Sequence, residues 1–413
     1  MQRLPKNNVL AGLDIGTSKV AAVIAEIDVE GPINIVGFGE TPSGGLRKGT
    51  IIDIECTARA AEKAADKAEQ MSGMAIDAVL VGITGPHISS VNNRGVVAVT
   101  GIGKEITEED AQRVVQAAKV ITLPSERQIV HVLPRQFIVD GYDGIVDPVG
   151  MCGSRLEVET NILTGAAASI QNTLKTVQRA GLEAGALVFN GLASAEAVLL
   201  PAEKELGVVL VDIGSGTTEV AIYEQKNLWY ASVLPVGGDH ITNDLAVGLR
   251  TPIAAAERIK REHGCVLEAL MPDDNYIDVP SVGGTETRQV SKKFLAAIIE
   301  PRIQEILSLI KREIHRSGYK GLLPGGVVIT GGSSLLDGLL VLAEEMLEMP
   351  VRRGQPLHIS GLVDLVSAPQ YSSAVGILHY GAKNLAAFQA APSGDFFLGS
   401  IWSRLTAWFK EIF

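Results

Sequence analysis

Two stretches of the chain repeat one pattern of apolar and polar positions. The sequences LAGLDIGTSKVAAVIAE (residues 10–26) and VVLVDIGSGTTEVAIYE (residues 208–224) each place a polar Asp-Ile-Gly tip between two apolar runs. Short apolar runs separated by glycine and hydroxyl residues are typical of buried strands joined by a turn. We therefore predict two β-hairpins whose tips lie 198 residues apart in the chain, from Asp14 to Asp212 (212 − 14).

Both predicted tips carry groups that suit a polyphosphate. Glycine lets the backbone turn tightly and bring its N–H groups close to a phosphate, while the nearby hydroxyls add donors. Asp14 and Asp212 can hold a hydrated Mg²⁺. The alternative for either motif alone is a simple turn between two strands. The nucleotide-binding candidates at the tips are Asp14, Gly16, Thr17, Ser18, Lys19, Asp212, Gly214, Ser215, Gly216, Thr217 and Thr218.

The patterns of two later segments predict helices that carry further nucleotide-binding candidates. In GGVVITGGSSLLDGL (residues 325–339) an apolar strand leads into a helical run through about Leu347. Bare backbone at a helix start suits a purine and its sugar-phosphate. The segment TPIAAAERIKREHG (residues 251–264) has proline near its start and glycine at its end, as helices prefer. The candidates in these segments are Gly331, Gly332, Ser333, Ser334, Glu257 and Lys260, although a solvated ion pair is the alternative for the last two.

The last eighteen residues, 396–413, predict an amphipathic helix. At about 100° per residue, eight large apolar side chains fall on one face and the polar ones on the other. A loose connector is predicted before this helix, at residues 386–395. Basic residues opposite a bulky apolar face are typical of a helix lying in the membrane surface, and packing on the protein's own body is the alternative. The membrane-facing candidates are Phe397, Leu398, Ile401, Trp402, Leu405, Trp408, Phe409 and Ile412.

Composition narrows the classes of function. A chain of 413 residues with 46% hydrophobic and 20% charged residues is typical of a globular protein of several domains. A net charge of −11 argues against nucleic-acid binding, because phosphate backbones recruit an excess of Lys and Arg. The three cysteines lack metal-ligand spacing and favour a reducing cytosol. No apolar run reaches the roughly 18 residues of a membrane span, so no transmembrane helix is predicted. The chain also lacks a P-loop motif.

Between the two hairpins, the segment TEEDAQRVVQAAK predicts a helix capped by Thr107, with acidic residues in its first turn. The segments GVVAV and RQFIVD predict strands, and the alternation in RLEVETNIL predicts a half-buried one.

The paired hairpins and the TGGS segment resemble the superfamily of actin, heat-shock chaperones and sugar kinases. The segments SGGLRKGTIIDIE, HVLPRQFIVDGYDGIVDPVGMCGSRLE, VPSVGG and FLAAIIEPR resemble, more narrowly, the FtsA family of bacterial cell-division proteins. The resemblance implies an α/β, actin-like two-lobe ATPase fold with an inserted 1C subdomain and a C-terminal amphipathic helix. It also implies ATP and Mg²⁺ as ligands, with at most weak ATPase activity.

A sugar-kinase-like or chaperone-like ATPase of the same superfamily is the alternative. A kinase needs a substrate pocket with a catalytic base, and no base can be identified in the sequence. A chaperone needs a substrate-binding domain after the nucleotide fold, where only about thirty residues remain.

The resemblance also implies a domain layout. Subdomain 1A comprises residues 1–83, 164–190 and 359–385, interrupted by the inserted 1C at 84–163. Subdomain 2A comprises 191–226 and 305–358, around 2B at 227–304. A flexible linker, 386–395, precedes the amphipathic helix, 396–413.

Several residue roles follow from the resemblance alone. Gly238 matches the glycine that approaches the nucleotide from the second lobe. Glu196 matches a carboxylate held near the attacking water, and a buried residue paired across the hinge is the alternative. Arg288 and Arg302 match arginines implicated in binding the C-terminal peptide of FtsZ, although either can be a solvated charge, and Arg302 is spaced to pair with Glu305.

The partners that the resemblance implies are FtsZ, further copies of the chain in filaments, later divisome proteins through 1C, and the lipid bilayer. The location that it implies is the cytoplasmic face of the inner membrane at the division site, as a peripheral protein.

Overall fold

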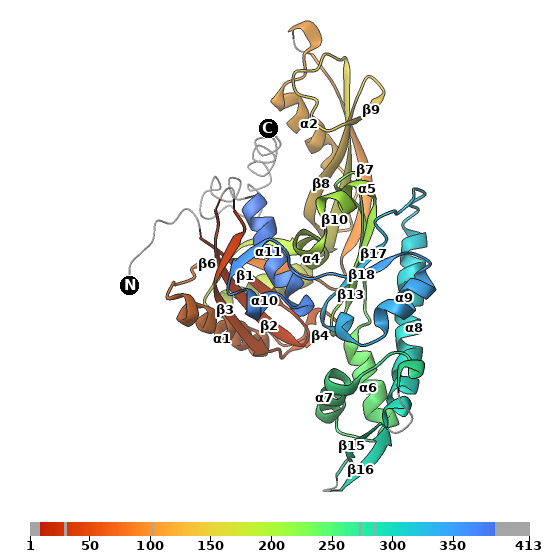
Figure 1. The fold of residues 1–413 in the computed structure, drawn as a ribbon. Helices are drawn as coiled ribbons and strands as arrows, with labels where there is room; N and C mark the ends of the chain where they lie inside the picture. Colours follow the sequence, from red (N-terminus) through yellow and green to blue (C-terminus); the bar gives the residue numbers. More distant parts are fainter. Residues whose placement is uncertain (1–8, 29–30, 101, 272–274, 284–285, 385–413) are drawn as a thin grey trace.

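The protein consists of two α/β lobes and an elongated inserted domain (Figure 1). The computed structural model describes residues 9–28, 31–100, 102–271, 275–283 and 286–384. The first lobe lies beside the middle of a long second sheet, the inserted domain extends from one end of that sheet, and a helical region extends from the other. The predicted two-lobe α/β class is therefore confirmed.

A six-stranded sheet forms the centre of the first lobe. The first hairpin lies at its middle, with the strands of the hairpin antiparallel and fully in register from Val9 opposite Glu26 to Ile15 opposite Val20. The strand order is β11 (Glu183–Phe189), β6 (Ala78–Ile83), β1 (Val9–Ile15), β2 (Lys19–Glu26), β3 (Ile33–Pro42) and β19 (Ile359–Gly361).

A nine-stranded sheet joins the second lobe to the inserted domain. Its order is β18 (Val351–Arg353), β17 (Val327–Thr330), β12 (Val208–Ile213), β13 (Thr218–Glu224), β14 (Asn227–Leu234), β7 (Ser89–Ala98), β10 (Arg155–Ala166), β8 (Arg127–Val139) and β9 (Tyr142–Ile145). The two parts of this sheet meet where Ser232 of β14 pairs with Ser89 of β7. The inserted domain is thus connected in sequence to the first lobe, whereas its strands extend the sheet of the second lobe.

Helices cover both faces of each sheet. In the first lobe, α1 (Ile54–Ser72) packs on β2 and β3 beside α3 (Ala167–Arg179). Between the lobes, α4 (Asn190–Val198) packs on α11 (Ser372–Lys383) and on both β12 and β13. The short α10 (Val363–Val366) and the 3₁₀ turn η4 (Pro369–Tyr371) precede α11.

The second lobe carries its helices on both faces of the nine-stranded sheet and beyond its end. They are α5 (Pro201–Leu206), α6 (Gly238–Gly248), α7 (Ile253–His263), η2 (Glu268–Leu270), α8 (Lys292–Arg316), η3 (Gly332–Leu335) and α9 (Leu339–Leu347), with the hairpin β15 (Tyr276–Pro280) and β16 (Thr287–Ser291) at the far end. The predicted helix between Pro252 and Gly264 is confirmed as α7.

Strand β12 explains why its sequence reads as a continuous apolar run. Val208 and Leu210 belong to the core shared with the first lobe, whereas Val209, Val211 and Ile213 belong to the core under the outer helices. Because both faces are buried, apolar residues occupy every position of the strand except Asp212 near its end.

The inserted domain confirms one local prediction and corrects another. Helix α2 (Glu108–Lys119) begins with a reciprocal capping box between Thr107 and Asp110. Strand β10 was predicted to be half-buried, but nine of its twelve residues are buried. The strand is paired with β7 and β8 along its two edges, and α2 and α3 pack on it, so most of its side chains are covered.

The TGGS segment departs from the predicted helix start. Residues Gly332–Leu335 form the 3₁₀ turn η3, and α9 begins only at Leu339. Gly331 has a φ of +83° and Gly338 one of +81°, so two left-handed glycines interrupt the chain where a continuous helix was expected.

Candidate functional site

The two predicted hairpins face each other tip to tip. The second pairs β12 with β13 in the same antiparallel register as the first, with Asp212 opposite Glu219. A Cβ placed on Gly216 would lie only 2.6 Å from the hydroxyl of Thr17, so the second tip touches the first. Only glycine fits at this contact, because a real Cβ does not approach another atom so closely. The structure therefore brings both candidate phosphate tips to one place between the lobes.

Asp14 lies buried at the end of β1. The amide of Asn190, the first residue of α4, donates to its Oδ1 at 3.0 Å. Burial raises the pKa of Asp14 to about 6, and the nearby ammonium of Lys19 opposes that rise. The other amide atom of Asn190, Oδ1, is buried and has no partner among the described residues. This acceptor and the Asp14 carboxylate are suited to orienting a water or a hydrated cation.

Asp212 occupies the matching position in the second hairpin. Two hydroxyls donate to its Oδ2: Ser194 of α4 at 2.5 Å and Ser373 of α11 at 3.2 Å. Burial raises the pKa of Asp212, and these two hydrogen bonds oppose it. Side chains of α4 and α11, the helices between the lobes, thus fix both aspartate carboxylates by hydrogen bonds. The backbone of each hairpin tip faces the tip of the other hairpin.

A third buried carboxyl, Glu219 of β13, lies beside the aspartates. Its Oε1 accepts from the hydroxyl of Thr217 at 3.0 Å and from that of Thr84, at the end of β6. Burial, reinforced by the charge of Asp212, raises the pKa of Glu219 to about 8. The hydrogen bond from Thr84 crosses from the first lobe to the second.

Residues of α6, α7 and η3 complete one side of the site around the carbonyl of Gly214. Gly238 donates its N–H to that carbonyl at 2.9 Å, and the hydroxyl of Ser333 donates to it at 3.3 Å. The Lys260 ammonium donates to the Gly238 carbonyl at 3.1 Å and to Glu257 at 2.6 Å. The structure therefore places these sequence candidates together. Lys260 and Glu257 form an ion pair at the edge of the site, but Lys260 is buried, so this is not the solvated pair that was the alternative for them.

Gly331 closes the same side against the second hairpin. A Cβ on it would lie 2.4 Å from Oδ1 of Asp212 and 2.6 Å from the carbonyl of Ile213. The Ser334 hydroxyl donates to the Gly331 carbonyl at 2.7 Å, which tightens the turn. Gly332 follows on this turn, where a Cβ would make only ordinary contact with Gln370.

Several hydroxyl and charged candidates are already engaged within the fold. Thr218 is fully buried and donates to the carbonyl of Val236, so its hydroxyl holds the segment between β14 and α6. Ser215 donates to Asp239. Lys19 lies 3.4 Å over the ring of Tyr371, and burial lowers its pKa to about 8. Ser18 is exposed, and Gly16 donates its N–H to the Lys19 carbonyl to close the first tip.

Glu196 lies away from the aspartates. Its two oxygens accept from the ammonium groups of Lys204, at 2.9 Å, and Lys383. Burial alone would raise the pKa of Glu196, but these two cations hold it at about 2. Lys383 ends α11 ten residues after Ser373, or roughly 15 Å along the helix. This geometry favours the alternative of a buried, paired residue over a base near an attacking water.

The two arginine candidates for peptide binding differ in their surroundings. Arg302 of α8 is held by Asp244, at 2.6 and 3.1 Å, and by Glu305. Hydrogen bonding to Asp244 raises the pKa of Arg302. Arg288 of β16 is exposed and donates to the carbonyl of Leu249. The predicted Arg302–Glu305 pair is therefore present, and Arg302 already has two carboxylate partners.

The sequence predictions missed Asn190, Ser194, Ser373, Thr84 and Glu219. Glu219 had a signal, since it is an acid inside the apolar run of the second hairpin, where an unpaired charge is costly. Asn190 and Ser194 lie on the helix of which only Glu196 was singled out, and Thr84 and Ser373 lie in segments without a motif. All four reach the site through the packing of α4, β6 and α11.

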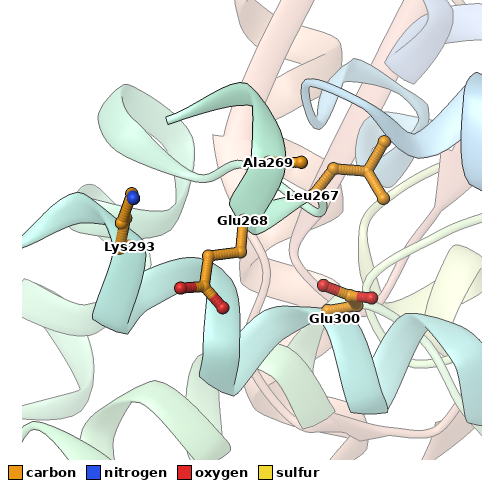
Figure 2. Close-up of a pocket in the computed structure, with 5 residues that line it drawn as sticks. All are labelled: Leu267, Glu268, Ala269, Lys293 and Glu300. Atoms are coloured by element: carbon orange, nitrogen blue, oxygen red, sulfur yellow. The ribbon is translucent and has the colours of Figure 1, made fainter. Parts of the chain in front are cut away.

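A separate hollow lies in the helical part of the second lobe. Figure 2 shows Leu267, Glu268 and Ala269 around η2 facing Lys293 and Glu300 of α8. None of these residues belongs to the nucleotide candidates.

The described residues bear on the predicted metal site and on membrane contact as follows. Within the described ranges, no group of three or more His, Cys, Asp or Glu residues is placed to hold a metal ion directly. No helix in the same ranges is long and apolar enough to cross a bilayer. The linker and the amphipathic helix, 386–413, lie outside the described residues.

Comparison with known proteins agrees with this architecture. One solved structure that shares it is a PilM-PilN type IV pilus biogenesis complex, with a TM-score of 0.65 and 17% identity, covering 90% of this chain and 98% of that one. Another is MreB5 of Spiroplasma citri bound to ADP, with a TM-score of 0.58 and 13% identity, covering 94% of this chain and 100% of that one. The two lobes and their facing hairpins therefore define an actin-like protein.

Sequence similarity then identifies the family. A family model described as "Cell division protein FtsA" matches residues 209–376, and one described as "SHS2 domain inserted in FTSA" matches residues 85–164. Cell division protein FtsA of Pseudomonas aeruginosa is 43% identical, covering 93% of this chain and 91% of the relative. That of Neisseria meningitidis is 41% identical, covering 97% and 98%. The chain belongs to the FtsA family of cell-division proteins, and its inserted domain is the one typical of that family.

Proposed function

We propose that this protein binds ATP with Mg²⁺ between its lobes, forms filaments at the cytoplasmic face of the inner membrane, and links the FtsZ ring to that membrane at the division site. The observation that supports ATP binding most directly is the tip-to-tip contact of Gly216 with Thr17, with a buried aspartate beneath each tip. A polyphosphate there would receive backbone N–H groups from both lobes.

The buried acids fit a hydrated cation. Burial raises the pKa of both Asp14 and Asp212, so each carboxylate lacks a full set of charge partners in the protein alone. A bound Mg²⁺ would supply the missing positive charge and balance the phosphates. Asp14 and Asp212 would hold it through water, Gly238 and Gly331 would border the nucleotide, and Glu257 with Lys260 would lie toward the nucleoside.

Nucleotide binding would act through lobe closure more than through turnover. A ligand that contacts both tips favours the closed arrangement, and it shifts that population without chemistry. Since Glu196 is fully paired, the described residues near the tips offer Asn190 as the group that can position a water. This arrangement accords with at most weak ATPase activity.

The membrane contact would come from residues 396–413, with Phe397, Leu398, Ile401, Trp402, Leu405, Trp408, Phe409 and Ile412 on its lipid side. One such helix binds weakly, whereas a filament presents many at once and raises their effective concentration. Further copies of the chain, and later divisome proteins through the inserted domain, would then assemble at the membrane.

We expect Trp408→Glu to reduce pelleting with anionic liposomes by about tenfold or more, because it removes about 2 kcal/mol of apolar burial and adds a negative charge at the lipid face. Thr406→Glu is the matched control, since residue 406 lies about 180° from Phe397 on the helix. Equal pelleting of the two variants would overturn the anchor.

For the FtsZ contact, we expect Arg288→Ala to weaken binding of an acidic FtsZ C-terminal peptide by about fivefold, the loss of one exposed charge pair. Arg302→Ala should have a smaller effect, because Asp244 and Glu305 already occupy the Arg302 guanidinium. Fluorescence anisotropy with a labelled peptide measures both, and a larger loss in Arg302→Ala would reverse the assignment.

A further inference from the structure

The inserted domain leaves the first lobe at a turn that is linked directly to the second nucleotide hairpin and, through Gly49, to the first. Strand β6 ends at Ile83, and the chain enters the inserted domain through Thr84 and Gly85. Gly85 has a φ of +135°, a conformation that only glycine adopts easily, so this turn requires glycine at position 85. We call Thr84, Gly85 and their contacts with Gly49 and Glu219 the junction.

On one side, the junction is tied to the second hairpin. The Thr84 hydroxyl donates to Oε1 of Glu219, and the Thr217 hydroxyl at the hairpin tip donates to the same oxygen at 3.0 Å. Thr84 and Glu219 are both buried, at 9% and 3% exposed, so water does not compete for these bonds. A displacement of the second tip is therefore passed to Thr84 through one shared acceptor.

On the other side, a small hairpin formed by β4 (Leu46–Arg47) and β5 (Thr50–Ile51) ties the junction to the first tip. Lys48 and Gly49 have φ values of +50° and +73°, as a two-residue hairpin turn requires. The Gly49 N–H donates to the Thr17 hydroxyl at 3.1 Å. A Cβ on Gly49 would lie 3.0 Å from the Thr217 side chain and 3.1 Å from Gly85.

The inserted domain is also anchored to the second lobe beyond the junction. Strand β7 pairs with β14 at Ser89 and Ser232. The Arg135 guanidinium stacks 3.7 Å over the ring of Trp229, and Asn161 donates to the Trp229 carbonyl at 2.9 Å. The inserted domain is thus covalently part of the first lobe and non-covalently part of the second, so a change in the angle between the lobes must move it relative to the first lobe.

We propose that Gly49 and the Thr84–Glu219 hydrogen bond are positioning elements through which the spacing of the two nucleotide hairpins sets the orientation of the inserted domain on the first lobe. The inference rests on the proposed ATP binding, because phosphates between the tips are what would change that spacing. In this proposal the LRKGT segment, residues 46–50, acts through the backbone of Gly49 and not through its exposed basic side chains.

The test is a distance measurement by electron paramagnetic resonance in the full chain. One spin label is placed on Cys152, which is exposed in the inserted domain, and the other on Glu62→Cys in α1, with Cys56→Ser to remove the second accessible thiol. Distances are measured without nucleotide, with Mg-ADP, and with Mg-ATP or its non-hydrolysable analogue. We expect the distance distribution to shift and narrow with the triphosphate in this reference protein.

Matched variants then separate the junction from general stability. Gly49→Ala and Gly73→Ala impose similar left-handed strain, at φ +73° and +70°, but a Cβ on Gly73 meets nothing within 4 Å. We expect Gly49→Ala to lose the triphosphate-dependent shift and Gly73→Ala to keep it. Thr84→Val should also lose it, whereas Glu219→Gln should keep it, because the amide oxygen accepts both hydroxyls.

Titration with a fluorescent ATP analogue is run on every variant. A shift that survives in Gly49→Ala and Thr84→Val would overturn the inference. A reference protein that binds ATP without any change in distance would also overturn it, yet leave the proposed function standing. A reference protein that binds no ATP would refute both.

Discussion

Gly331→Ala is expected to weaken ATP binding on the order of 100-fold, a loss of about 2.7 kcal/mol. The added Cβ would lie 2.4 Å from Oδ1 of Asp212 and 2.6 Å from the Ile213 carbonyl. Either Asp212 or the turn after β17 must move, and both border the space between the hairpin tips. The φ of +83° adds backbone strain of about 1 kcal/mol or more.

Gly338→Ala provides the control for this prediction. Gly338 has a φ of +81°, but the nearest atom to its Cβ is the flexible side-chain end of Leu270 at 3.2 Å. Titration with a fluorescent ATP analogue and thermal melting are both measured. If both variants lose a similar amount of stability but only Gly331→Ala loses affinity for the ATP analogue, the result supports a nucleotide site beside Gly331. Equal loss of affinity in both variants would mean that backbone strain, and not contact with Asp212, governs binding.

Glu196→Gln is expected to destabilise the protein by about 3 kcal/mol at pH 7. The paired cations hold the pKa of Glu196 at about 2, against an ordinary value of 4.5, and each pKa unit corresponds to about 1.4 kcal/mol. Because the folded-state pKa is lowered, this stabilisation is present above pH 4.5 and is lost as the pH falls toward 2. The difference between wild type and variant should therefore narrow from pH 7 to pH 3.

Urea unfolding at pH 7, 4 and 3 measures this difference. Glu55→Gln is the control, because its pair with Arg179 is exposed and should contribute no more than about 1 kcal/mol. ATP affinity should be unchanged in both variants. If Glu196→Gln instead kept its stability and lost ATP turnover, the catalytic role first inferred from the family resemblance would be restored.

The contrast between Glu196 and Glu219 explains where sequence reasoning reached its limit. Both are acids in apolar surroundings, and family resemblance favoured Glu196 because it lies on the helix between the lobes. In the fold, Lys204 and Lys383 neutralise Glu196, and Lys383 comes from a helix 187 residues later. Glu219 instead faces Asp212 across the hairpin and receives a hydroxyl from Thr84, 135 residues earlier. Neither set of partners leaves a local signal.

The sequence alone determined the local elements of this protein. Apolar runs around two Asp-Ile-Gly tips were sufficient to predict both hairpins, and a Thr107 cap and a Pro252-to-Gly264 span located two helices, because turns, caps and burial patterns act over a few residues. Only the tertiary structure decided that the tips meet at Thr17 and Gly216, that Asn190 and Ser194 hold the aspartates, and that the inserted domain extends the second sheet. Those arrangements depend on contacts between residues far apart in the chain, and the pattern around any one residue does not specify its distant partner.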